Sequence, residues 1–329
     1  MRSIRIISVF SLYLVLILLA IFDETGSTQC TRYGNPPAKS SGSMLNYKKM
    51  VQVCQSISGQ LLSFTDSKNA LRCACLLITS SSKRLPLVVW FQPSIAYSTS
   101  VFNTSFTVEA YTTKLTSTPN GPSGYHLLLP AARLTKNFEC HGIECIAWDI
   151  WYRNFNRSDP NMNVDVQTID YFINYVVYHM SNLHVDSSRV FLSGWSNGAS
   201  MALLYALNTP TIAAAAVYSS TNPYRNANDP CPQTPYPSQR TSVLDLVNEC
   251  DYTGICTGGQ QFIGDLNNRF GNHLTAKFIT INGYSDPMPT STPRCRNCLK
   301  AVGLLHHIRW PVNLNNQIFY SFFRNYTLH

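Results

Sequence analysis

A chain of 329 residues in which 45% are hydrophobic can bury a substantial core, which excludes a disordered protein. The net charge is +8, but the basic residues are scattered along the chain instead of forming a stripe, so we expect no nucleic-acid partner. The sequence contains no long internal repeat and no sustained low-complexity segment. These properties indicate a globular protein with one large domain.

Residues 1–27 have the pattern of a secretory signal peptide. The short basic segment Met1–Arg5 precedes the apolar run Ile6–Phe22, and the polar stretch Asp23–Ser27 follows it. The apolar run has 17 residues, the lower limit for crossing a bilayer, so an uncleaved anchor is the alternative. We therefore expect a secreted, extracellular protein with no stable membrane partner unless the signal is retained.

The cysteines and glycosylation sequons agree with export. The chain has eleven cysteines, and disulfides persist in oxidising compartments. The sequons at Asn103, Asn156 and Asn325 are usable only on the secretory route. We therefore expect a disulfide-bonded glycoprotein.

The spacing of the cysteines does not fix their pairing. Cys250 and Cys256 close a short loop and are the first choice for a bonded pair, and Cys140 with Cys145 is a second near pair. An odd count leaves at least one cysteine free or intermolecular. A zinc site is a less favoured alternative, because exported cysteines are more often in disulfides. Its ligands would be Cys73, Cys75, Cys295 and Cys298.

The remaining chain divides into two parts. Residues 28–84 are rich in Ser, Gly and Cys and have weak periodicity, so we interpret them as a disulfide-tied extension of the main domain at 85–329. In that domain, apolar runs predict strands at Leu87–Phe91, Leu127–Leu129, Val190–Leu192, Ile212–Tyr218, Val243–Val247 and Phe278–Ile281. Helices are expected at 169–180, 199–207 and 318–323, and a turn at Val185–Ser188. The alternation predicts an α/β fold with a mostly parallel sheet flanked by helices.

Gly194-Trp195-Ser196-Asn197-Gly198 is a G-x-S-x-G pattern between a predicted strand and a predicted helix. Small residues two positions either side of Ser196 allow a strained turn that lifts the hydroxyl above the sheet edge. The pattern alone is weak evidence, but the strand, turn and helix context is the one in which it marks a catalytic serine.

A serine becomes a strong nucleophile when an imidazole takes its proton and a carboxylate orients the imidazole. In the α/β-hydrolase arrangement the acid and then the base follow the serine in the chain. Asp251, four residues beyond the strand that ends at Val247, is the first choice for the acid. Glu249 and Asp286 are alternatives, whereas Asp245 alternates within a strand and is interpreted as structural.

His306 and His307 are the candidate bases, because both follow the last predicted strand. Five further histidines precede the serine or lie at the wrong place in the chain: His126, His141, His179, His184 and His273. For the oxyanion hole, the residue after the nucleophile, Asn197, supplies one backbone N–H. The loop after the strand at Leu87–Phe91 supplies the other, and Ser94 is the better donor because Pro93 has no N–H.

From about Leu85 to Phe323 the chain resembles secreted α/β-hydrolases of the polyhydroxybutyrate depolymerase and feruloyl esterase type. The matching segments are Pro86–Trp90, Val185–Val190, Gly194–Ala199, Asn248–Asp251 and His307–Pro311. The resemblance implies Ser196 as nucleophile, Asp251 as acid and His307 as base. The chain has Gln92-Pro93 where the family usually has His-Gly, and two residues instead of one between His307 and Trp310, which keeps His306 as an alternative base.

The leading hypothesis is a secreted serine esterase that needs no metal or organic cofactor. The resemblance implies ester substrates linked to polysaccharide or polyester, including aromatic acyl esters. The aromatic stretch Trp148–Tyr152 with Phe155 lines a substrate pocket in one interpretation and belongs to the core in the other. A catalytically inactive binding or adhesion protein and a serine peptidase are the alternative functions.

Overall fold

The computed structural model describes residues 47–67, 69–94, 102, 124–135, 145–148, 150, 157, 164–224, 236, 241–252, 254–284, 287–310 and 312–328. The predicted signal peptide, the sequons at Asn103 and Asn156, Cys140 and the alternative acid Asp286 lie outside these residues. Among the residues described, no helix is both long and apolar enough to cross a bilayer.

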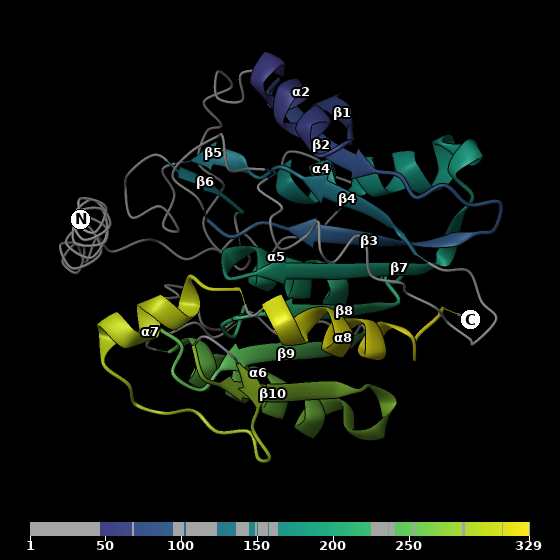
Figure 1. Cartoon of the computed structure of the whole chain (residues 1–329). Helices are drawn as coiled ribbons and strands as arrows, with labels where there is room; N and C mark the ends of the chain where they lie inside the picture. Colours follow the sequence, from purple (N-terminus) through teal and green to yellow (C-terminus); the bar gives the residue numbers. More distant parts are fainter. Residues whose placement is uncertain are drawn as a thin grey trace, which may run out of the picture.

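A nine-stranded sheet forms the centre of the protein (Figure 1). Its order is β1 (Gln60–Thr65), β2 (Leu71–Leu77), β4 (His126–Pro130), β3 (Leu85–Phe91), β7 (Val185–Trp195), β8 (Ala214–Tyr218), β9 (Ser242–Asn248), β10 (Ala276–Asn282) and β11 (Met288–Pro289). The strands from β4 to β10 in this order pair in parallel, and β1, β2 and β11 pair antiparallel at the edges. The two short strands β5 (Arg133–Thr135) and β6 (Cys145–Ala147) form a separate ladder.

Helices cover both faces of the sheet. They are α2 (Tyr47–Ser56), α4 (Val164–Asn174), α5 (Asn197–Leu207), α6 (Ile255–Phe270), α7 (Lys300–His307) and α8 (Val312–Phe323). In Figure 1, α8 crosses one face, while α4, α5 and α6 lie behind the sheet. Because both faces are covered, β3, β4, β8 and β9 are buried along their whole length, which explains their continuous apolar sequences. This is the α/β-hydrolase arrangement that the sequence predicts.

Two predicted elements differ in detail from the structure. The helix expected at 169–180 continues from α4 into a π-helical turn at Tyr175–His179. The turn expected at Val185–Ser188 is wrong, because these residues belong to β7. They lie in an irregular part of the β3–β7 ladder, which pairs Leu85 with Val185 but Leu87 with Val190. The Asp186 carboxylate accepts bonds from the N–H and hydroxyl of Ser188 at 3.1 and 2.7 Å, so turn chemistry occurs inside a bulge.

The described part of the Cys-rich extension belongs to the same sheet. β1 pairs with β2, and β2 pairs with β4. The disulfide Cys54–Cys75 ties α2 to β2. Cys73 is a free, buried thiol, and burial raises its pKa to about 11, so we expect it to be chemically inert.

The expected bond between Cys250 and Cys256 is wrong. Cys250 bonds to Cys298 and Cys256 bonds to Cys295. Cys256 is carried away from Cys250 by α6, while the segment at 294–298 returns beside the loop, where the N–H of Arg296 donates to the carbonyl of Glu249 at 2.7 Å. The alternative zinc site is also wrong, since Cys75, Cys295 and Cys298 are in disulfides.

Asp245 predicts a pH-dependent stability. It is fully buried in β9; one carboxylate oxygen accepts the N–H of Ser220 at 3.3 Å and the other has no hydrogen-bond partner. Burial, and then the charge of Asp251, raise the pKa of Asp245 well above its usual range. Between the unfolded and the folded pKa, Asp245 is protonated in the folded state but ionised in the unfolded state. The free energy of unfolding therefore falls as the pH rises above the unfolded pKa of this group.

We expect Asp245→Asn to stabilise the protein relative to wild type, by an amount that increases with pH. The increase is at most about 1.4 kcal/mol per pH unit, because one proton is involved. Urea unfolding of both proteins at pH 5 and pH 8 measures it. A difference between the two proteins that is the same at both pH values would contradict a titrating Asp245.

Candidate active site

Ser196 lies at the sharp turn between β7 and α5. Its backbone has φ 55° and ψ −122°, a conformation that L-residues rarely adopt. A side chain on Gly194 would lie 2.5 Å from the carbonyl oxygen of Gly198, and one on Gly198 would overlap the carbonyl oxygens of Phe91 and Gln92. The two glycines therefore allow the backbones of β7, α5 and the end of β3 to approach closely, as the pentapeptide predicts.

Ser196, His307 and Asp251 form one hydrogen-bonded chain. The Ser196 hydroxyl lies 2.7 Å from Nε2 of His307, and Nδ1 of the same ring lies 2.8 Å from Oδ1 of Asp251. The Asp251 side chain is fully buried, and that of His307 is 16% exposed. The structure thus brings together the three residues that the family resemblance implies, from positions 111 and 56 residues apart in the chain.

Asp251 is held by neighbours on both oxygens. The Ser219 hydroxyl donates to Oδ2 at 2.5 Å, and the N–H of Tyr252 donates to Oδ1 at 2.6 Å. Ser219 directly follows β8 and has a positive φ of 59°. Ser219 is not among the site residues predicted from the sequence. Its position could have indicated a role: Ser219 is a polar residue at the carboxyl end of β8, next to the strand that carries Ser196. The carboxyl ends of neighbouring parallel strands lie at the same edge of a sheet.

His307 is the last residue of α7, and its position is fixed from the nucleophile side. The indole N–H of Trp195, which precedes Ser196, donates to the carbonyl of His307 at 3.0 Å. The alternative base His306 points elsewhere: its ring packs edge-on against Tyr284 at 5.5 Å. Burial lowers the pKa of His306. The geometry therefore favours His307 over His306 as the partner of Ser196.

Glu249, the alternative acid that the structure describes, and the structural residue Asp245 are both bonded to groups other than His307. The carboxylate of Glu249 lies 2.7 Å from Arg294 and 3.3 Å from Arg296. Asp245 is inside β9 and bonds to Ser220. Glu249 thus joins the loop at 249–252 that carries Asp251, here called the acid loop, to the segment that carries the two disulfide cysteines Cys295 and Cys298.

The expected oxyanion loop lies directly beside the start of α5. The side chain of Asn197 accepts the N–H of Trp148 at 2.7 Å and donates to its carbonyl at 3.0 Å. The Trp148 indole N–H donates to the carbonyl of Gln92 at 3.2 Å. These bonds connect the first residue of α5 to the end of β3. Ser94 is half-buried two residues further on, and its N–H as the second donor stays a prediction.

Gln92 is an unusual residue at this place. Both polar atoms of its side-chain amide are buried and have no hydrogen-bond partner. Such an arrangement costs free energy, and proteins often retain it at functional sites. This buried amide lies at the start of the expected oxyanion loop.

The aromatic stretch at 148–155 is described only in part. Trp148 is fully buried and packs edge-on against Phe91 at 5.2 Å, and Ile150 is also buried. Trp148 therefore belongs to the core that supports the site. The other aromatic residues of the stretch lie outside the described residues.

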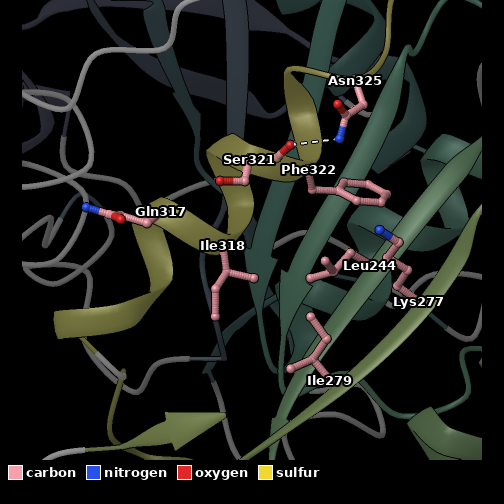
Figure 2. A pocket seen from close by; sticks show the side chains of 8 residues that line it. All are labelled: Leu244, Lys277, Ile279, Gln317, Ile318, Ser321, Phe322 and Asn325. Carbon is pink, nitrogen blue, oxygen red and sulfur yellow. Dashed lines mark hydrogen bonds between the residues drawn. The ribbon is translucent and has the colours of Figure 1, made fainter. Parts of the chain in front are cut away.

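A groove of about 430 Å³ lies under α8 and is separate from this site (Figure 2). Its walls come from β9, β10 and α8 and include Leu244, Ile279 and Phe322. Asn325, the acceptor of the third sequon, lies at its rim and donates to the carbonyl of Ser321 at 3.0 Å. None of the three residues of the hydrogen-bonded chain lines this groove.

No model of a known protein family matches the sequence, and no curated protein is similar to it. Solved structures with a similar fold include a thermostable esterase, with 12% identity, a TM-score of 0.49 and coverage of 82% of this chain. The chain spans 63% of the length of that esterase.

Two further structures with a similar fold are a second esterase and a peptidase. Carboxyl esterase 2 from the fungus Tuber melanosporum has 12% identity and a TM-score of 0.49, with 82% of this chain and 87% of the esterase covered. An acylaminoacyl peptidase from Pyrococcus horikoshii has 9% identity and a TM-score of 0.46, with 82% and 41% covered. At this level of similarity they are comparisons of fold alone.

Proposed function

We propose that the protein is a secreted serine hydrolase that cleaves carboxylic esters through an acyl-enzyme. The observation that carries the proposal is the hydrogen-bonded chain from Ser196 through His307 to Asp251, with the serine on a strained strand-to-helix turn. This is the geometry that activates a serine hydroxyl.

The proposed reaction has two halves. Ser196 Oγ attacks the ester carbonyl carbon while its proton moves to Nε2 of His307, and Asp251 stabilises the imidazolium through Nδ1. The oxyanion accepts hydrogen bonds from the backbone N–H groups of Asn197 and Ser94. The intermediate then expels the alcohol, which takes the proton from Nε2. Water then attacks the acyl carbon while His307 Nε2 takes its proton. The bond between the acyl carbon and Ser196 Oγ breaks, Oγ takes the proton back from Nε2, and the carboxylic acid leaves.

Labelling with a fluorophosphonate tests the proposal. The mature protein is treated with the probe, and mass spectrometry locates the adduct; Ser196→Ala is the control. We expect one adduct, on Ser196, and turnover of short-chain and aromatic esters such as methyl ferulate. A folded protein with no adduct would instead favour an inactive binding or adhesion protein, and release of amines but not of acids would establish a peptidase.

The substrate class and the location are parts of the same proposal. Esters linked to polysaccharide or polyester are the substrates that the family resemblance implies. Three disulfides among the described residues agree with an oxidising compartment. Expression with the signal at 1–27, followed by mass measurement before and after enzymatic deglycosylation, tests secretion and the use of Asn325, which is exposed beyond α8.

Gly303 allows α7 to pack closely against the loop that carries Asp251. A methyl group there would lie 3.0 Å from the carbonyl oxygen of Asp251 and 3.1 Å from the Cα of Tyr252. We expect Gly303→Ala to shift α7 by a few tenths of an ångström and to lower kcat for a soluble ester roughly tenfold, because such displacements misalign the base. Ester hydrolysis and urea unfolding measure the two effects.

Gly264→Ala is the matched control, since it lies in α6 and a methyl group there meets nothing within 4 Å. Alanine is better than glycine in a helix by about 1 kcal/mol, so this variant should be more stable and fully active. Equal activity of the two variants would show that the position of α7 does not depend on Gly303.

A further inference from the structure

Exposed apolar side chains gather around α7. Of the ten large hydrophobic residues exposed in the described chain, six lie between residues 284 and 308. Leu299 and Leu305 have exposed fractions of 78% and 48%. We call the α7 surface the group of Tyr284, Leu299, Val302, Leu305 and Ile308.

α7 contacts the rest of the protein at Gly303 and through its last two residues, His306 and His307. Gly303 is its buried residue, and it faces the Asp251–Tyr252 loop. Figure 1 shows α7 at one end of the sheet, apart from α8, which crosses the sheet itself. Exposed apolar groups at several successive turns are rare on a protein surface unless they mark an interaction site.

Most of the charged residues in the sequence around these apolar groups are basic, and Asp286 and Glu249 are the acidic exceptions. Between Pro287 and Trp310 the sequence has no acidic residue and four basic ones, all exposed: Arg294, Arg296, Lys300 and Arg309. Glu249 pairs with Arg294 and Arg296 and balances one of these charges. The guanidinium of Arg309 lies over the Tyr284 ring at 4.3 Å, at the edge of the α7 surface.

A short helix with exposed aliphatic side chains, a lysine in its first turn and arginines on the segments before and after it has the chemistry of a segment that lies in the interface of an anionic lipid layer. Aliphatic groups enter the boundary between head groups and acyl chains, while lysine and arginine contact the phosphates. A polysaccharide would instead require polar groups and aromatic faces, and only Tyr284 in the α7 surface is aromatic. We infer that the α7 surface docks reversibly on anionic lipid surfaces.

Docking at this place would bring the lipid to the candidate active site, because α7 ends at His307, whose ring contacts Ser196. The substrate class that follows is an ester of an amphiphile held in that surface. This part of the inference rests on the proposed function, whereas the docking does not. It also refines the expectation of no stable membrane partner: the exposure of α7, which the sequence does not reveal, provides a peripheral contact.

Vesicle flotation tests the docking without hydrolysis. The full mature protein with Ser196→Ala is mixed with phosphatidylcholine vesicles that contain or lack phosphatidylglycerol. We expect binding to the anionic vesicles, and weaker binding as salt screens the charges. Adding Leu299→Glu and Leu305→Glu should lower the partition constant about tenfold or more, because both side chains lose their apolar contact with the lipid. Adding Lys300→Gln should lower it about fivefold.

Tyr178→Glu is the matched control. Tyr178 is as exposed as the α7 residues but lies on the π-helical turn after α4, so its replacement should leave vesicle binding unchanged. Circular dichroism and the unfolding temperature establish that each variant is folded. Equal binding to both vesicle types, or an equal loss in Tyr178→Glu and the α7 variant, would overturn the inference.

The two proposals fail in different ways. If the protein bound vesicles but its wild-type form, which retains Ser196, did not react with the fluorophosphonate, the docking inference would stand and the proposed hydrolase function would be refuted. Labelling of Ser196 without vesicle binding would do the reverse. Sedimentation velocity tests whether the α7 surface instead binds a second copy of the chain. A protein that does not bind vesicles, and whose dimer the Leu299→Glu and Leu305→Glu changes convert to monomer, would assign the surface to self-association and overturn lipid docking.

Discussion

Asp165→Ala is expected to destabilise the protein by about 3–5 kcal/mol, the usual effect of removing one partner from a buried ion pair. Asp165, in the first turn of α4, is fully buried. Its carboxylate lies 2.7 Å from Arg72 of β2 and 3.4 Å from Arg133 of β5, and both arginine side chains are 2% exposed. The alanine variant would leave two guanidinium groups in the interior without this carboxylate.

Urea unfolding measures the effect, with Asp186→Ala as the control. Asp186 pairs with Arg189 at 2.6 Å, but both side chains are partly exposed, so this change should cost only about 1 kcal/mol or less. Asp165→Asn, which keeps the shape and one acceptor, should lie between the two. If the two alanine variants lost similar stability, the buried cluster would contribute no more than a surface pair.

The central strands and the serine turn were predictable because their signals are local. Each buried parallel strand is a continuous apolar run, and the glycines at 194 and 198 are needed by backbone contacts within the turn itself. The order of serine, acid and base along the chain made Asp251 the first choice for the acid but left Glu249 and Asp286 as alternatives. Family resemblance was required to prefer His307 over His306, because neighbouring residues satisfy the same chain order.

Contacts between segments that are distant in the chain could not be predicted from the sequence. Arg72 and Asp165 are 93 residues apart, and no local pattern connects them. β2 contains Arg72 and two cysteines, so its apolar character is interrupted and the strand was not recognised. The disulfide partners of Cys250 and Cys256 lie 48 and 39 residues away, and their pairing depends on how the segment at 294–298 returns to the acid loop.

The exposure of α7 was also beyond the sequence. Its apolar residues have helical spacing, which normally predicts a face buried against the core. In the fold α7 contacts the acid loop through Gly303 and leaves the larger apolar side chains outside. The helix was not among the predicted elements, and only the tertiary structure shows that its apolar face is uncovered.

Asp251→Asn is expected to lower kcat/KM for a soluble ester by about 10⁴-fold while the protein stays folded. Asp251 accepts Nδ1–H of His307 at 2.8 Å, which leaves Nε2 free to take the proton of Ser196. An asparagine is of the same size but offers no negative charge, and when its amide N–H faces the ring it favours the wrong tautomer of the imidazole. Steady-state hydrolysis measures the loss, and the rate of fluorophosphonate labelling should fall with it.

Two matched controls decide between the candidate acids. Glu249→Gln removes the carboxylate that pairs with Arg294 and Arg296, and Asp286→Asn removes the second alternative from the sequence. Both should keep kcat/KM within about tenfold of wild type, because neither group orients His307 in the proposed mechanism. If either variant lost activity as severely as Asp251→Asn, or if Asp251→Asn remained active, the contact between Asp251 and His307 would be structural and the acid would have to be sought elsewhere.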